Sequence, residues 1–155
     1  MMDKRRQKLL CTVLLVLNLG FIWGNSLLPA DASQALSNGT GSFMGLLLHL
    51  GDLTQLGSVL IRKAAHFAEF AALGMLLAWQ LWLREKNIGR AVLWGLLAAC
   101  IDESIQFFVP GRAPGLLDVA IDVCGAAAGM ILLQTGDRNV RRKQPTKLEE
   151  KQRKR

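Results

Sequence analysis

Four apolar stretches, separated by short polar segments, set the organisation of this chain. They cover residues 9–24, 64–83, 91–109 and 116–134. A helix needs about 20 mostly apolar residues to cross the hydrocarbon core of a membrane, and each stretch approaches that length. The pattern therefore predicts an all-α fold. We expect a polytopic membrane bundle of about four transmembrane helices, joined by short turns that make neighbours antiparallel.

Positive charge accumulates on one side of the predicted bundle. The chain has 19 Lys and Arg against 12 Asp and Glu, a formal net charge of +7. Apart from Arg62, Lys63 and Arg112, every Lys and Arg lies in the N-terminus, the 84–90 loop or the C-terminal tail. Because cytoplasmic segments are enriched in Lys and Arg, both termini are predicted to be cytoplasmic.

The spans divide the chain into segments. Residues 1–24 form a first transmembrane helix with a basic N-terminus. Residues 25–61 form an extracytoplasmic loop, in which the short amphipathic segment 43–50 is expected to be an interfacial or re-entrant helix. Residues 62–135 form a three-helix core, and residues 136–155 form a basic, disordered cytoplasmic tail.

The first span has an alternative interpretation as a cleaved signal peptide. Ala30-Asp31-Ala32 resembles a small-residue cleavage site. We favour a retained helix, because the apolar run continues to Ala30 and is longer than the apolar region of a usual signal peptide. In either case the segment that follows lies on the extracytoplasmic side of the membrane.

Ionisable and amide side chains interrupt three of the spans, always toward the same end. They are His66, Glu69, Asp102, Glu103, Gln106, Asp118 and Asp122. Since the spans alternate in direction, all of these residues fall in the outer half of the bilayer. A charge in hydrocarbon costs about 2.5–3.5 kcal/mol, so such side chains normally face a partner or a wet cavity. One polar site inside the membrane is therefore predicted.

Helical spacing indicates which of these side chains can meet. Arg62, His66 and Glu69 are four and three residues apart and share one face. His66 and Glu69 either bond to each other or point together into the bundle. Asp102 and Glu103 are adjacent and point about 100° apart, so one is expected to face His66 and the other the fourth helix or Arg112.

The fourth span carries two acids and two glycines at helical spacing. Asp118 and Asp122 share a face, and Asp118 lies near the helix N-terminus, where the helix dipole favours an acid. Asp122 lies one turn deeper and capping does not explain it. Gly125 and Gly129 form a G-x-x-x-G pattern that lets helices pack closely. We interpret the pattern as packing within the bundle, and a homodimer through the same glycines is the alternative.

These residues divide into three predicted groups. The candidate catalytic residues are His66, Glu69, Asp102, Glu103 and Asp122. The candidate substrate-binding residues are Arg62, Lys63, Gln106, Arg112 and Asp118. A divalent cation is the candidate cofactor, because hard cations prefer oxygen ligands. Its candidate ligands are Asp102, Glu103, Asp118 and Asp122.

The ordered polar motifs resemble those of the VanZ family. They read Arg62-Lys63-x-x-His66-Phe67-x-Glu69-Phe70, then Asp102-Glu103-x-x-Gln106-x-x-x-Pro110-Gly111-Arg112, then Asp118-x-x-x-Asp122-x-x-Gly125. Asn25-Ser26-x-x-Pro29-x-x-x-Ser33 also resembles the exit of the family's first helix. The resemblance implies a bacterial multi-pass protein of the plasma membrane, of a type associated with resistance to the glycopeptide teicoplanin. Phe70 departs from the family pattern, which usually has Tyr there.

Three functions fit these patterns. The first is an envelope enzyme or binding protein that acts on a lipid-linked or cell-wall precursor at the outer leaflet. The second is a structural or interaction protein whose polar residues only hold the bundle together. The third is an ion-coupled transporter, which is disfavoured because the inner halves of the spans are apolar. We expect the lipid bilayer and an envelope precursor as partners, and no nucleic acid. Whether a reaction is catalysed stays open.

Overall fold

The computed structural model describes residues 3–33, 35, 39 and 56–143. Within them the long helices are α1 (Lys4–Ser26), α3 (Leu56–Leu83), α4 (Arg90–Phe107) and α5 (Leu116–Lys143). Residues 30–33 form a short helical segment after α1. No strand occurs in these described ranges, so the all-α prediction is confirmed.

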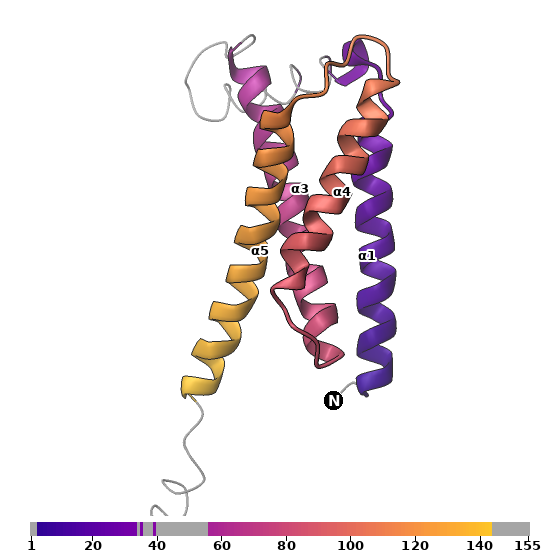
Figure 1. The fold of residues 1–155 in the computed structure, drawn as a ribbon. Coiled ribbons are helices and arrows are strands. Elements are labelled where there is room, and N and C mark those ends of the chain that lie inside the picture. Colours follow the sequence, from indigo (N-terminus) through magenta and orange to yellow (C-terminus); the bar gives the residue numbers. More distant parts are fainter. Residues whose placement is uncertain (1–2, 34, 36–38, 40–55, 144–155) are drawn as a thin grey trace, which may run out of the picture.

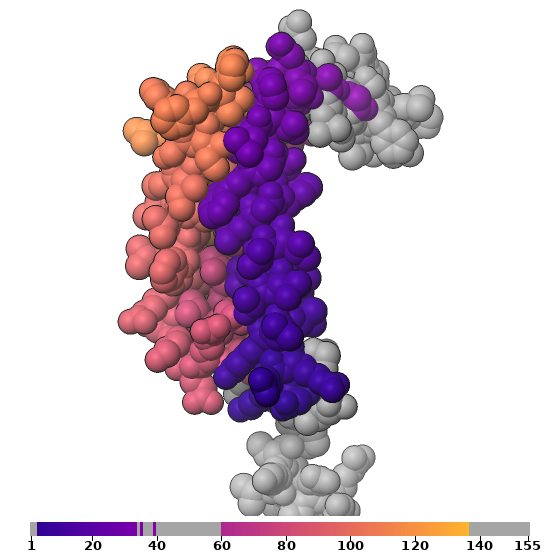
Figure 2. Space-filling model, turned by 90° about the vertical axis from the view of Figure 1, so that its right-hand side faces the viewer, coloured from indigo at the N-terminus to yellow at the C-terminus, as the bar shows by residue number. Residues whose placement is uncertain are grey.

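The helices alternate in direction and form an antiparallel bundle (Figure 1). At the upper end of Figure 1, residues 27–33 after α1 meet the 108–115 loop between α4 and α5. The amide of Ala30 donates to the carbonyl of Pro110 over 3.5 Å, and Figure 2 shows the two segments side by side. The N-terminus, the 84–89 loop and the end of α5 lie at the opposite, lower end. Both ends of the described chain therefore lie on one side of the bundle.

Three of these helices are long and apolar enough to cross a membrane. They are Lys4–Ser26, Leu60–Leu83 and Leu116–Gly136. Many large apolar side chains on the bundle face outward, among them Leu9, Leu17, Leu93 and Leu132. Such a surface suits lipid rather than water. α4 has only 18 residues and carries Arg90, Asp102 and Glu103. Its crossing of the membrane stays a prediction.

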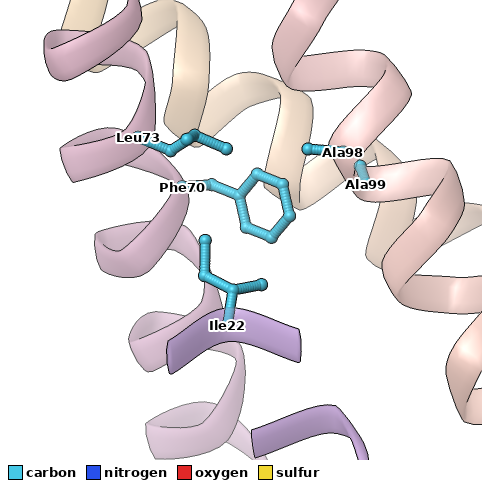
Figure 3. Packing of buried hydrophobic residues seen from close by; sticks show 5 residues of the cluster. All are labelled: Ile22, Phe70, Leu73, Ala98 and Ala99. Carbon is cyan, nitrogen blue, oxygen red and sulfur yellow. The ribbon is translucent and has the colours of Figure 1, made fainter. Parts of the chain in front are cut away.

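The apolar core lies where α1, α3 and α4 meet. Figure 3 shows Phe70 between Ile22 of α1, Leu73 of its own helix, and Ala98 and Ala99 of α4. All five are buried, and Phe70 is fully enclosed. Because surrounding lipid would be as apolar as these side chains, their close contacts stabilise the bundle more than removal from water does. A hydroxyl at Phe70 would enter this apolar core rather than the polar site.

α3 and α5 make the closest approach in the bundle. A Cβ at Gly74 would overlap the backbone of Ala126 on α5, and one at Gly129 would overlap the carbonyl of Ala71 on α3. Gly125 is less tightly enclosed, but a Cβ there would still lie 2.5 Å from the Phe67 carbonyl oxygen. The close packing predicted for the glycine pattern therefore occurs within the chain. The homodimer stays a prediction, and α3 already covers both of its proposed contact residues.

Two predicted boundaries differ from the observed ones. α3 begins at Leu56, inside the segment predicted as loop, because the apolar residues before Arg62 continue its helical pattern. The predicted tail begins at residue 136, whereas α5 continues to Lys143; the disorder of the tail stays a prediction. Arg and Lys are good helix formers and extend the helix past its apolar part. Segment 43–50 and residues 144–155 lie outside the described residues.

Candidate functional site

The upper half of α3 supplies the first wall of the site. Arg62, Lys63, His66 and Glu69 follow one another along one side of the helix, as their spacing predicts. Lys63 forms an ion pair with Asp118 of α5. Oε1 of Glu69 accepts a hydrogen bond of 3.0 Å from Nδ2 of Asn25 on α1. The predicted alternative of a bond between His66 and Glu69 is not the arrangement found, since each side chain turns to a different helix.

Asp102 of α4 is fully buried and held on both carboxylate oxygens. Its Oδ1 accepts a hydrogen bond of 2.6 Å from Oγ of Ser26, and its Oδ2 accepts one of 3.0 Å from Nε2 of Gln106. Gln106 also donates to Ser26 Oγ over 3.4 Å. The three side chains form a closed network between α1 and α4, so the orientation of the Asp102 carboxylate is fixed.

Glu103 diverges from Asp102, as the geometry of adjacent helical residues predicts. Its Oε2 accepts a hydrogen bond of 2.9 Å from the amide of Gly115, at the start of α5. The loop between them turns at Gly111, whose φ of 76° lies in the left-handed region that favours glycine. A Cβ on Gly111 would also press on Ala30. Glu103 therefore anchors the loop that closes the upper end of the site.

Asp122 of α5 is fully buried, and among the described residues neither of its oxygens has a hydrogen-bond partner. The nearest group of opposite character is His66, whose Nδ1 lies 3.7 Å from Asp122 Oδ1 and 4.0 Å from Asp102 Oδ2. His66 Nδ1 is buried and likewise unpartnered within the described part of the chain. Burying a charged carboxylate without a partner costs several kcal/mol, which is comparable to the whole free energy of unfolding of a domain. The buried Asp122 carboxylate therefore requires a ligand or a proton.

These side chains surround a cleft of about 180 Å³. It is lined by Arg62, Lys63, His66, Glu103, Gln106, Gly111, Arg112, Ala113, Asp118, Ile121 and Asp122. Eight of the ten predicted site residues are in this lining. The other two, Glu69 and Asp102, do not line it and contact α1 instead.

Two guanidinium groups at the cleft have no carboxylate partner in the described residues. Lys63 pairs with Asp118, whereas neither Arg62 nor Arg112 forms a salt bridge there. Arg112 instead donates to the carbonyls of Leu28 and Asn25, over 3.2 and 3.3 Å. Partial burial and the neighbouring Arg62 charge lower the pKa of Arg112, but a guanidinium remains charged in a protein. Both positive charges are thus available to an anion.

The predicted metal ligands divide into two pairs. Glu103 and Asp118 are engaged by the Gly115 amide and by Lys63. Asp102 and Asp122 meet near His66, which the prediction had not included among the ligands. One potential ligand atom from each of His66, Asp102 and Asp122 lies within 4.8 Å of the others.

Sequence reasoning assigned no site role to α1, yet Asn25 and Ser26 hold Glu69 and Asp102. The available clue was a pair of polar residues at the end of an otherwise apolar helix, before Pro29. Cleavage near Ala32 would remove both contacts from the site. The packing of α1 against α3 and α4 therefore favours its retention.

Comparison with known proteins supplies the family. No curated protein and no solved structure matches this chain. The family model described as VanZ/LLP1 matches residues 10–136, which extend from the first turns of α1 through all the site residues. The match covers most of the chain, and the membrane-type helices agree with it. The chain belongs to the VanZ/LLP1 family.

Proposed function

We propose that this protein binds the phosphate-bearing head group of a lipid-linked envelope precursor in its cleft. In this proposal it is a multi-pass protein of the bacterial plasma membrane with both termini in the cytoplasm. The upper end of the bundle then lies at the outer leaflet. The proposal follows the predicted topology, and the family resemblance to teicoplanin-resistance proteins supplies the cell-envelope context.

The observation that carries the proposal is the pair of arginines, Arg62 and Arg112, at one polar cleft without carboxylate partners among the described residues. Guanidinium groups suit bidentate binding of phosphate. Two hydrogen bonds to backbone carbonyls already orient the Arg112 side chain, so it loses little conformational entropy when it binds a ligand.

The size of the cleft restricts what it can hold. Pockets that enclose drug-sized ligands measure roughly 300–1,000 Å³, and this cleft is smaller. It suits a phosphate or diphosphate group whose lipid chains stay in the bilayer. A whole glycopeptide does not fit, so we expect any effect on teicoplanin resistance to act through the precursor.

One observation supports the alternative function, a structural or interaction protein whose polar residues only hold the bundle together. The bonds from Asn25, Ser26 and Gly115 to three acids show that part of the polar set serves to hold helices together. Asp122 and the two arginines are different: within the described residues Asp122 has no hydrogen-bond partner, and neither arginine has a carboxylate partner. We therefore place ligand binding on this second group.

Arg62→Ala and Arg112→Ala test the proposal. The protein is purified in lipid nanodiscs from a bacterial host, and co-purifying phospholipids and polyprenyl phosphates are measured by mass spectrometry. A phosphate-bearing lipid should be enriched with the wild type and fall roughly tenfold in each variant, since a charge-assisted contact contributes about 1.5–3 kcal/mol. Arg84→Ala, at the exposed lower loop, is the matched control and should retain the lipid. Equal lipid content in all four proteins would refute the proposal.

A further inference from the structure

We propose that His66, Asp102 and Asp122 bind one divalent transition-metal ion beside the cleft, and that zinc is the best match. The three residues come from α3, α4 and α5, so the ion would join the helices that surround the cleft. One potential ligand atom from each residue lies within 4.8 Å of the other two. This site differs from the set of four acids that the sequence predicts.

The separations between these atoms fit a shared ion better than direct contact. Nδ1 of His66 is 3.7 Å from Asp122 and 4.0 Å from Asp102. A charge-assisted hydrogen bond needs about 2.7–2.9 Å. Two ligands of a tetrahedral zinc ion, each about 2.0–2.2 Å from the metal, are separated by roughly 3.3–3.6 Å. The two observed separations are a few tenths of an ångström longer, so the side chains would need to move only slightly to bind one ion.

Burial supplies a second, independent indication of a ligand. Asp122 has no exposed surface, and neither of its oxygens finds a partner among the described residues, although they face a histidine nitrogen that also lacks one. A buried charge without a partner is strongly unfavourable, whereas coordination to a cation satisfies both groups at once.

The surroundings of Asp102 are those expected of an oriented metal ligand. Ser26 and Gln106 each donate a hydrogen bond to its carboxylate, which fixes the direction of the oxygen lone pairs. Metal-bound carboxylates are commonly held in this way, and such outer contacts affect metal affinity by about 10–100-fold. Glu103 and Asp118 lie outside the group of three whose ligand atoms come within 4.8 Å of one another, and they contact the Gly115 amide and Lys63 instead.

The donor set indicates the kind of metal. One imidazole nitrogen and two carboxylate oxygens match zinc and its first-row neighbours. Calcium and magnesium prefer oxygen alone. Three protein ligands leave a further coordination position, as in zinc sites that bind an exchangeable ligand. His66 and Asp122 line the same cleft as Arg62 and Arg112, so a group bound in the cleft would be able to occupy that position.

A link between the metal and a bound phosphate rests on the function proposed above. In that case the phosphate oxygen takes the open coordination position while the arginines hold its other oxygens. The metal site itself rests on the geometry and burial of three side chains, and its test does not depend on whether the protein binds a lipid.

Metal content tests the site directly. The full chain, carrying a purification tag without histidine, is produced in zinc-supplemented medium and purified in lipid nanodiscs. Plasma mass spectrometry should find about one zinc per chain, and His66→Ala and Asp122→Asn should lower that content roughly tenfold or more. Asp122→Asn is the sharper variant, because the described residues show no hydrogen bond that it would break.

Asp118→Asn is the matched control. It makes the same chemical change one turn away on the same helix, at a residue held by Lys63, and it should retain zinc. Adding zinc to the chelator-treated wild type should raise its Tm and leave the Tm of Asp122→Asn unchanged. Wild-type protein with no more zinc than Asp122→Asn, or equal loss in Asp118→Asn, would overturn the site.

The two proposals fail in different ways. Wild-type protein that lacks zinc but retains an arginine-dependent phosphate lipid would remove the metal site and leave the proposed function. One zinc per chain with a lipid content indifferent to Arg62→Ala and Arg112→Ala would remove the proposed function and support the metal site.

Discussion

In the middle of the bundle α3 and α5 meet through glycines and alanines, whereas in its upper part the same two helices meet through ionisable side chains. Gly74 and Gly129 leave no room between the backbones. About two turns higher, His66 and Asp122 face each other without a hydrogen bond, and about one turn beyond them Lys63 pairs with Asp118. The glycine contacts need no further partner, whereas some of the ionisable groups have none among the described residues.

The difference shows that two regions of one helix pair have different roles, close packing in one and the polar site in the other. Close backbone contact in the middle of the bundle holds α3 and α5 at a fixed separation. That fixed separation keeps His66 and Asp122 together at the upper end, where bare polar groups alone would drive the helices apart. Variants in the two regions should therefore separate folding from function.

Gly129→Leu should have the largest effect. A side chain at this position overlaps the Ala71 backbone, which cannot rotate away, so α3 and α5 must separate. Overpacking of this kind costs about 1–3 kcal/mol or more, and we expect folded protein to fall at least tenfold in membranes, measured by immunoblot and by size-exclusion chromatography. Gly136→Leu is the control on the same helix, because nothing lies within 4 Å of its Cβ position. Equal abundance of the two variants would contradict the packing described.

Asp122→Asn should abolish function and leave the amount of protein unchanged. The substitution breaks no hydrogen bond among the described residues, so the helices should still insert and assemble. The teicoplanin susceptibility of a host that depends on this protein should equal that of the strain without it, at normal membrane abundance.

Asp102→Asn provides the contrast to Asp122→Asn. It replaces an acceptor held by Ser26 and Gln106, so we expect a loss of stability of about 1–3 kcal/mol together with the loss of function. Reduced abundance in Asp122→Asn, with normal abundance in Asp102→Asn, would reverse the roles assigned to the two acids.

Much of this architecture could be predicted from periodicity and charge. The four apolar stretches predict the order of the helices. Spacings of three or four residues predict which polar side chains lie on the same face of a helix. Divergence of Asp102 and Glu103 also follows from helix geometry alone. The hydrogen-bond partner of each polar side chain could not be predicted from the sequence, because it depends on how the helices are rotated against one another. Nothing local to Ser26 indicates that α1 turns it toward Asp102, across 76 residues of chain.

The metal ligands illustrate the same limit. Composition favoured a set of acids, since carboxylates bind hard cations. The fold instead places Glu103 against the Gly115 amide and Asp118 against Lys63, outside the group, and it brings His66 to the remaining pair. Which acids are already engaged is a property of packing and cannot be read from spacing.

Ser26→Ala should have an intermediate effect. It removes the hydroxyl donor to buried Asp102 and leaves that oxygen unsatisfied, which costs about 1–3 kcal/mol. We expect the Tm of the purified protein to fall by several degrees and metal content to fall less than in Asp122→Asn. Ser104→Ala is the matched control, because its exposed hydroxyl only donates to the Cys100 carbonyl of its own helix. A Tm unchanged in both variants would show that α1 does not position Asp102.

The smallest effect is expected at the lower end, where a polar pair lies far from the cleft. Nε2 of Gln80 donates to Oγ1 of Thr12 over 2.7 Å. Each single variant, Gln80→Leu or Thr12→Val, leaves one polar group without its partner. Replacing both with apolar groups of similar shape is often nearly neutral, so the double variant should lie within about 1 kcal/mol of the wild type. Because the proposed site is confined to the upper half, all three variants should retain the wild-type amount of phosphate-bearing lipid. Loss of that lipid at normal abundance would extend the functional path to the lower end, as a transporter requires, and would contradict the division between the two regions.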